Sequence, residues 1–226
     1  MSSSPCFLDP VVIPLLRGKT LLDVGCGYGR WASLVSTNYW ETESGEPMEV
    51  DGFDAFLPNV SLCLKKNVYR RVWQQQLPSI LSGRWDTVLA SEILEHLDEE
   101  HVPDVLQTLE KAAKRRVIIT TPNWECFRGG GDTIVGYNEF EAHKTYIPRE
   151  YFLERDYTVI GAGFGNPTHP VVSAFRGMQG DWKSALELLP RLIPELAHTV
   201  VAYKDVDDPS EGSTAESQSN EVQARE

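Results

Sequence analysis

The stretch LLDVGCGYGR, residues 21–30, decides the fold of this chain of 226 residues. Residues 20–24 are apolar apart from Thr20 and Asp23, which suits a strand buried on both faces. Gly25, Gly27 and Gly29 follow at alternate positions, before a helical pattern begins at residue 30. Glycine lets the backbone turn sharply and lets a ligand lie against the main chain where a Cβ would collide. The stretch therefore predicts a strand, a ligand-binding turn and a helix.

Short apolar segments alternate with helical ones along the rest of the chain, which indicates an α/β fold with a parallel sheet and crossover helices. Further strands are expected at residues 50–53, 69–73, 87–90, 116–121, 157–160 and 198–203. Helices are expected at residues 30–36, 58–66, 99–113 and 182–192, and a short one starts at Pro148. Residues 123–147 show no clear period and are long for a connection, which is typical of a lid or binding loop.

Composition excludes several classes of protein. The chain carries 21 basic and 33 acidic side chains, a net charge of −12 that repels a bare phosphate backbone, so free DNA or RNA is not expected as a partner. The apolar run at residues 11–16 contains Pro14 and is too short to span a membrane. The first residues lack a secretory pattern and the four cysteines lack CxxC spacing, so we expect a cytoplasmic protein.

Charge is concentrated in the last 22 residues, which hold seven acidic side chains against Arg225 alone, half of the total net charge. Val222 is the one aliphatic residue after Asp207, so this segment has too little apolar surface to offset its ordering entropy. We therefore expect one domain over residues 1–204 and a disordered acidic C-terminal tail over residues 205–226. A solubilising role for the tail is favoured over a docking role.

The glycine turn has a competing interpretation as a dinucleotide site. That site needs GxGxxG, but Arg30 stands where the third glycine belongs. Asp23, at the strand end, would repel a pyrophosphate and would hold the ammonium group of an amino acid instead. Asp54, 25 residues after Gly29, is placed to accept hydrogen bonds from ribose hydroxyls. A ligand with an amino-acid end and a nucleoside end satisfies both carboxylates.

With these residues, the chain resembles a class I S-adenosylmethionine-dependent methyltransferase of the small, type 11-like kind over residues 16–165. The resemblance rests on LDVGCGYGR, on the acid in VDGFDAF, on WDTVLASEILEHL and on VIITTPN. It implies a Rossmann-like three-layer sandwich with a mostly parallel seven-stranded sheet and an antiparallel last strand. S-adenosylmethionine is the implied cofactor.

The resemblance also assigns the cofactor site. Asp23 and the glycine turn would hold the methionine moiety, Asp54 would hold the ribose, and Ser91 and Glu92 would line the other side. Relatives often bind the adenine amino group with an aspartate where this chain has three glutamines, so Gln75 or Gln74 would supply the oxygen. The expected cofactor-binding residues are Asp23, Gly25, Cys26, Gly27, Gly29, Asp54, Ala55, Gln75, Ser91 and Glu92.

His143, in the long loop, is the expected catalytic residue, as a general base or substrate contact. His169 ranks second, and its alternative is a turn histidine between prolines; Glu95 and His96 are expected to shape the pocket. Aromatic residues of the same loop indicate an apolar acceptor pocket, with ordinary loop packing as the alternative; they are Trp124, Phe127, Tyr137 and Phe140. No metal site is expected, because neither HxxxH spacing nor paired cysteines occur.

These observations predict methyl transfer to a small organic molecule, at oxygen in preference to nitrogen or carbon. Methylation of the exocyclic amine of a base is disfavoured, because ASEI replaces [DN]PP[YF] after the fourth strand. Two alternatives stay open: a methyltransferase acting on a protein or tRNA, and a non-catalytic subunit that binds S-adenosylmethionine. Neither the acceptor nor the oligomeric state follows from the sequence, and a homodimer is left open.

Overall fold

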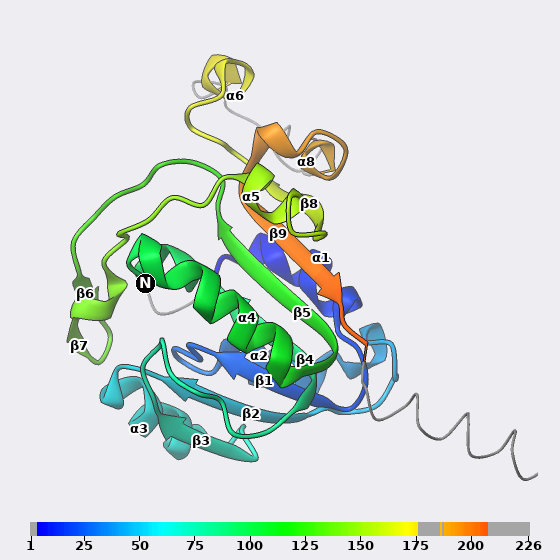
Figure 1. Cartoon of the computed structure of the whole chain (residues 1–226), viewed down its shortest axis with the longest axis vertical. Coiled ribbons are helices and arrows are strands. Elements are labelled where there is room, and N and C mark those ends of the chain that lie inside the picture. Colours follow the sequence, from blue (N-terminus) through cyan, green and yellow to red (C-terminus); the bar gives the residue numbers. More distant parts are fainter. Residues whose placement is uncertain (1–3, 176–185, 187, 208–226) are drawn as a thin grey trace, which may run out of the picture.

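A seven-stranded sheet forms the centre of the molecule in the computed structural model, which describes residues 4–175, 186 and 188–207 (Figure 1). The strands lie in the order β3-β2-β1-β4-β5-β9-β8. Strand β9 runs antiparallel to both of its neighbours, β5 and β8, and the pairs on the other side are parallel. This arrangement confirms the predicted fold class. The bounds are β1 Thr20–Val24, β2 Glu49–Asp54, β3 Arg71–Gln74, β4 Trp85–Ser91, β5 Ala113–Pro122, β8 Thr158–Phe164 and β9 Ala197–Asp205.

Alternate side chains of the central strands point into two separate cores, which makes the fold a three-layer sandwich. On one face, Leu22 and Val88 pack in a cluster with Leu109 of α4 (Val102–Ala112). On the other face, Leu21 and Leu89 pack in a cluster that contains residues of α1 (Asp9–Val12) and α2 (Arg30–Thr37). Figure 1 shows α4 in front of the sheet, with α1 and α2 behind it. The remaining helices are α3 Leu57–Lys66, α5 Arg149–Leu153, α6 Pro170–Phe175 and α8 Leu189–Leu192.

Several element boundaries differ from the sequence-based expectation. The helix expected at residues 99–113 starts as a 3-10 turn, Glu99–His101, and α4 begins at Val102, next to Pro103. Proline suits the first helical turn because the amide it lacks has no partner there. Of the helix expected at residues 182–192, the structure describes α8, whereas residues 182–185 and 187 lie outside the described part. The short helix α1 was not anticipated.

The long connection after β5 contains a two-stranded hairpin of its own. Strands β6 (Gly131–Thr133) and β7 (Gly136–Asn138) pair antiparallel, and an isolated bridge joins Arg128 to His143. Figure 1 shows this hairpin at the left margin of the molecule, apart from the seven-stranded sheet. Residues 123–147 show no regular hydrophobic period because they form short paired segments and not one long helix or strand.

Structured chain extends past residue 204, where the sequence placed the start of the tail. Asp205 is the last residue of β9, and its carboxylate oxygen lies 2.6 Å from the Nε of Arg116 on β5. The backbone amide of Val206 donates to the carbonyl of Arg115. Residues 208–226 lie outside the described part of the chain. Within the described residues, helices of the length and apolar character that crossing a bilayer requires do not occur.

Candidate cofactor and acceptor cavities

A cavity of about 410 Å³ lies where β1, β2 and β4 end. This edge of an open α/β sheet is where such folds place their ligands. The turn after β1, the residues after β2 and the residues after β4 each contribute to its lining. Of the ten predicted cofactor-binding residues, eight line it: Gly25, Cys26, Gly27, Asp54, Ala55, Gln75, Ser91 and Glu92.

The glycine turn is held in shape by Asp54. Gly25 and Gly27 have φ of 67° and 51°, in the left-handed region that favours glycine. Asp54 Oδ2 accepts a hydrogen bond of 2.8 Å from the amide of Gly27, and its Oδ1 accepts one of 2.8 Å from the amide of Phe56. Burial raises the pKa of Asp54, and these two donors act against that shift. The carboxylate thus joins β1 to β2 and keeps acceptor capacity toward the cavity.

Asp23 and Gly29, the other two predicted residues, are not among those that line this cavity. Asp23 is only 1% exposed, and the hydroxyl of Tyr69 donates a hydrogen bond of 2.6 Å to its carboxylate. Burial raises the pKa of Asp23 to about 7. Gly29, with φ of 79°, is the N-cap of α2. The carboxylate of Asp23 thus lies behind the turn and is paired with Tyr69, and its direct contact with a ligand stays a prediction.

Gln75 lines the cavity, and Gln74 does not, which favours Gln75 of the two glutamines expected near the adenine amino group. The Oε1 of Gln75 accepts a hydrogen bond of 2.7 Å from the indole of Trp73, and its Nε2 donates one of 2.7 Å to Ser79. The side chain is thus held in one orientation. One lone pair of its oxygen is left for a ligand.

The loop after β5 forms part of the cavity wall, in line with the binding loop expected from its sequence. Residues from the end of β7 and the following turn line it: Asn138, Glu139, Phe140, Glu141 and Lys144. The backbone amides of Lys144 and Thr145 both donate to the carbonyl of Glu95, which fixes the loop against the segment after β4. His101, the last residue of the 3-10 turn before α4, also contributes to the lining.

A second cavity, of about 670 Å³, lies beside the first. Glu92 and His96 line both cavities, so the two meet at these residues. Trp124 and Phe127 line the second cavity, which supports part of the aromatic pocket expected from the sequence. Phe140 belongs to the first cavity instead, and Tyr137 lines neither.

His143 lines the second cavity, and its two ring nitrogens both have partners. The guanidinium of Arg128 lies 2.7 Å from Nε2, and Cys126 Sγ lies 3.0 Å from Nδ1. Because arginine only donates, Nε2 accepts and the imidazole is neutral. Burial, reinforced by His96 and Arg128, lowers the pKa of His143 to about 3. In this arrangement His143 is a weak base. His169 accepts from the amide of Val171 and lines neither cavity.

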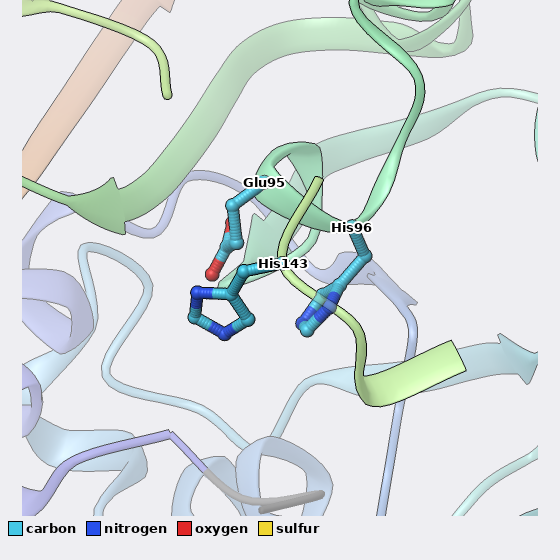
Figure 2. Close-up of side chains that lie close together, drawn as sticks. All are labelled: Glu95, His96 and His143. Atoms are coloured by element: carbon cyan, nitrogen blue, oxygen red, sulfur yellow. The ribbon is translucent and has the colours of Figure 1, made fainter. Parts of the chain in front are cut away.

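Glu95, His96 and His143 converge at the junction of the cavities (Figure 2). Their ligand atoms all lie within 4.8 Å of one another, and the rings of His96 and His143 have centroids 4.8 Å apart. Glu95 and His96 belong to the 3-10 turn Leu94–His96, whereas His143 comes from the loop after β5. The sequence suggests separate roles for these residues and no metal site. In the sequence, the acid and the two histidines stand in two separate motifs, EILEHL and NEFEAHKTY. The distance between these motifs along the chain does not indicate that their side chains meet.

Glu92 adopts a left-handed backbone conformation, with φ of 58°, which is uncommon for a residue with a side chain. Its amide donates to the carbonyl of Thr120, and the Thr120 hydroxyl donates to its Oε1 at 2.9 Å. Burial of the carboxyl raises the pKa of Glu92 to about 7. Such strained residues gather at functional sites, and this one places a carboxyl between the two cavities.

Comparison with known proteins agrees with this geometry. The family model described as methyltransferase domain matches residues 7–160. No curated protein sequence matches the chain. Among solved structures, a S-adenosylmethionine-dependent methyltransferase from Archaeoglobus fulgidus is similar, with a TM-score of 0.52, 16% identity, and coverage of 88% of this chain and 91% of that one.

Two further structures share the fold. An S-adenosylmethionine-dependent methyltransferase from Mesorhizobium loti has a TM-score of 0.56 and 13% identity, and the match covers 89% of this chain and 98% of that one. An O-methyltransferase from a multienzyme of Brevibacillus brevis, in complex with S-adenosylhomocysteine, has a TM-score of 0.51 and 13% identity, over 88% of this chain and 72% of that one. The chain therefore belongs to the methyltransferase-domain family, as a methyltransferase with the class I fold.

Proposed function

We propose that this methyltransferase takes its methyl group from S-adenosylmethionine, bound in the first cavity, and transfers it to an oxygen of a small organic molecule in the second. The observation that carries the proposal is the continuity of the site. One cavity joins the glycine turn to Asp54, and it meets an aromatic-lined cavity at Glu92 and His96.

The lining residues divide between the parts of the donor. The main chain of Gly25 and Gly27 faces the methionine moiety, and Asp54 accepts from a ribose hydroxyl. Gln75 lies toward the adenine, while Ser91 and Glu92 bound the opposite side. Asp23 acts as a positioning residue, because its bond to Tyr69 supports the turn from behind.

Methyl transfer needs little acid–base help on the donor side, because the sulfonium becomes a neutral thioether as the bond breaks. The protein contributes mainly by aligning the acceptor, the methyl group and the sulfur in one line. The junction at Glu92 and His96 is the place where a donor in one cavity and an acceptor in the other come together. The Brevibacillus brevis neighbour, an O-methyltransferase, supports oxygen as the acceptor atom.

Calorimetry with the full chain tests donor binding. We expect one equivalent of S-adenosylmethionine or S-adenosylhomocysteine to bind, and Asp54→Asn to weaken binding at least about 10-fold, since a hydrogen bond to a charged group contributes roughly 1.5–3 kcal/mol. Asp132→Asn, on exposed β6, is the matched control and leaves affinity unchanged. Binding of a nicotinamide dinucleotide in place of either compound would overturn the proposal.

A second experiment addresses the acceptor. The full chain is incubated with S-adenosylmethionine carrying a labelled methyl group and with fractionated metabolite extract. We expect one fraction to contain a product heavier by one methyl group, on oxygen, together with S-adenosylhomocysteine. The protein and tRNA fractions of the same cells are incubated in parallel, and label found only in those fractions would contradict a small-molecule acceptor.

A further inference from the structure

We propose that Glu95, His96 and His143, with Glu92 beside them, bind a divalent transition-metal cation at the junction of the two cavities. The binding of the cation does not depend on the proposed function, whereas its role in the reaction does. Glu95, His96 and His143 come from two segments that the fold brings together, and Figure 2 shows these three side chains close to one another.

The distances fit a site that closes slightly on binding. A cation about 2.0–2.2 Å from each oxygen and nitrogen ligand requires ligands roughly 3–4 Å apart. The ligand atoms of Glu95, His96 and His143 already lie within 4.8 Å of one another. A shift of about 1 Å in the side chains therefore completes the coordination.

The carboxyl group of Glu95 supports a cation site independently of the distances between the three side chains. Its side chain is 1% exposed, and among the described residues its Oε1 has no hydrogen-bond partner, while its Oε2 lies 3.3 Å from the hydroxyl of Thr121. Buried polar atoms in folded proteins are normally satisfied, so an orphaned carboxylate oxygen beside two imidazoles indicates a missing partner. A cation supplies both the contact and the opposite charge.

His96 is oriented as a metal ligand would be. Its Nδ1 lies 3.0 Å from the carbonyl of Ala142. With the proton on Nδ1, that nitrogen donates to the carbonyl and Nε2 is left with a free lone pair. A histidine ligand usually donates its other ring nitrogen to a carbonyl or carboxylate in this way, which fixes the ring.

Arg128 occupies the edge of the cluster in this structure. Its guanidinium lies against His143 and 3.9 Å from Glu141, and its side chain is 48% exposed. The arginine provides a positive charge near the carboxylates without reaching Glu95 Oε1. Because half of it faces solvent, it is able to swing outward and release the His143 ring to the cation.

The ligand set selects the class of cation. Imidazole nitrogens favour zinc, iron, cobalt and nickel, and carboxylates widen the range to manganese. Calcium and magnesium prefer oxygen ligands throughout and are disfavoured. A mixed set with two histidines therefore points to a divalent transition metal.

The cation would activate the acceptor, a task for which His143 is poorly suited because the guanidinium of Arg128 occupies the lone pair of its Nε2. Bound to the acceptor hydroxyl, it lowers the pKa of that hydroxyl, and the proton passes to solvent water. The oxygen then attacks the methyl carbon of S-adenosylmethionine. A carbon–oxygen bond forms, the carbon–sulfur bond breaks, and its electron pair stays on sulfur, which gives S-adenosylhomocysteine.

Metal binding is tested on the full chain after treatment with a chelator and without donor or acceptor. We expect Co²⁺ to bind at one equivalent and to give visible absorption bands, and Zn²⁺ and Mn²⁺ to bind in calorimetry. Glu95→Gln and His143→Gln should each weaken Co²⁺ binding about 10- to 100-fold. His169→Gln is the matched histidine control and should bind Co²⁺ like the parent chain.

Retained affinity for S-adenosylhomocysteine shows that Glu95→Gln and His143→Gln are folded. Absence of saturable binding of all three cations to a parent chain that binds S-adenosylhomocysteine would overturn the site, as would unchanged Co²⁺ affinity in both variants. If the cation binds but methyl transfer is equally fast with and without chelator, the activating role is wrong. Failure of the donor to bind would be a failure of the proposed function, because the cation titration contains no donor.

Discussion

At the scale of single residues, Gly25 carries both a conformational and a steric requirement. Its φ is 67°, and a Cβ at this position would lie 2.0 Å from the Cδ1 of Ile93. Gly45 offers a matched comparison, because its φ is 62° but a Cβ there would meet nothing within 4 Å. Replacing Gly45 by alanine therefore measures backbone strain alone, whereas replacing Gly25 adds the steric contact with Ile93 to the same strain.

We expect Gly45→Ala to lower the free energy of unfolding by about 1 kcal/mol, the cost of a left-handed alanine. Gly25→Ala should lose roughly 1–3 kcal/mol more through overpacking against Ile93, and it should abolish binding of S-adenosylhomocysteine. Urea unfolding and calorimetry measure the two effects. Equal losses of stability in the two variants would show that Ile93 yields without cost.

Asp23 gives a prediction about pH. Its pKa is about 7 in the folded chain, mainly through burial, and close to the ordinary value of 3.8 when unfolded. The folded state therefore binds more protons than the unfolded state between these values, so ionisation of Asp23 destabilises the fold as the pH rises through this window.

Asp23→Asn removes that ionisation and keeps an oxygen for the hydroxyl of Tyr69. Relative to the parent chain, the variant should gain about 2 kcal/mol in free energy of unfolding between pH 5 and pH 8, in the absence of ligand. Denaturant unfolding at the two pH values checks this. A difference between the variant and the parent that stays constant with pH would mean that Asp23 titrates normally.

At the scale of elements, the end of β9 is fixed to β5 by one ion pair. Arg116 is buried, and its guanidinium makes two hydrogen bonds to the carboxylate of Asp205, of 2.6 and 2.8 Å. It also donates to the carbonyl of Leu15 and lies over the ring of Tyr203. The ion pair lowers the pKa of Asp205, so its contribution to stability is present at neutral pH and is lost as the pH falls through the lowered value.

Asp205→Asn should lower the free energy of unfolding by about 1–2 kcal/mol at pH 7, because a largely buried guanidinium loses its charged partner while the exposed side of Asp205 limits the effect. A chain that ends after Asp207 keeps the pair and should unfold like the full chain. Thermal and urea unfolding of both test this. Equal stability of Asp205→Asn and the parent would show that Leu15 and Tyr203 suffice to hold Arg116.

At the scale of the whole molecule, the first cavity is built from segments far apart in the sequence. The turn after β1, the end of β2 and the loop of β6 and β7 all contribute to its walls. A ligand that contacts all of these segments should raise the free energy of unfolding of the whole domain, and not only the stability of a single element. The same ligand should order the loop, since residues 138–141 form part of the lining.

S-adenosylhomocysteine at 100 times its Kd should raise the free energy of unfolding by about 2.7 kcal/mol. Hydrogen exchange should slow in residues 138–141 and around residues 25–27, while β8, which lies at the opposite edge of the sheet from β3 and outside the cavity lining, should exchange as before. Mass spectrometry of peptides, with and without ligand, measures both. Protection at the glycine turn without protection of the loop would contradict the cavity as described.

The sequence predicted the elements of the fold better than it predicted the side-chain contacts of the site. Residues 20–29 indicated β1, the turn and α2 because strand burial, glycine conformation and helix onset are local properties. The prediction that Asp23 contacts the ligand depended on where its side chain points, which only the position of Tyr69 on a neighbouring segment reveals. The assignment of His143 to the site came from its loop, but its partners Arg128 and Cys126 were not predictable from spacing.

The sequence by itself determined the α/β order of elements, the glycine turn with Asp54 beside it, and the loop that covers the site, since each follows from periodicity or backbone conformation along a short stretch. Only the tertiary structure decided which side chains share a cavity. Glu95 and His96 meet His143 because the loop after β5 folds back onto the turn after β4, a contact between residues nearly fifty positions apart. Such contacts depend on packing of the whole chain, and no local pattern encodes them.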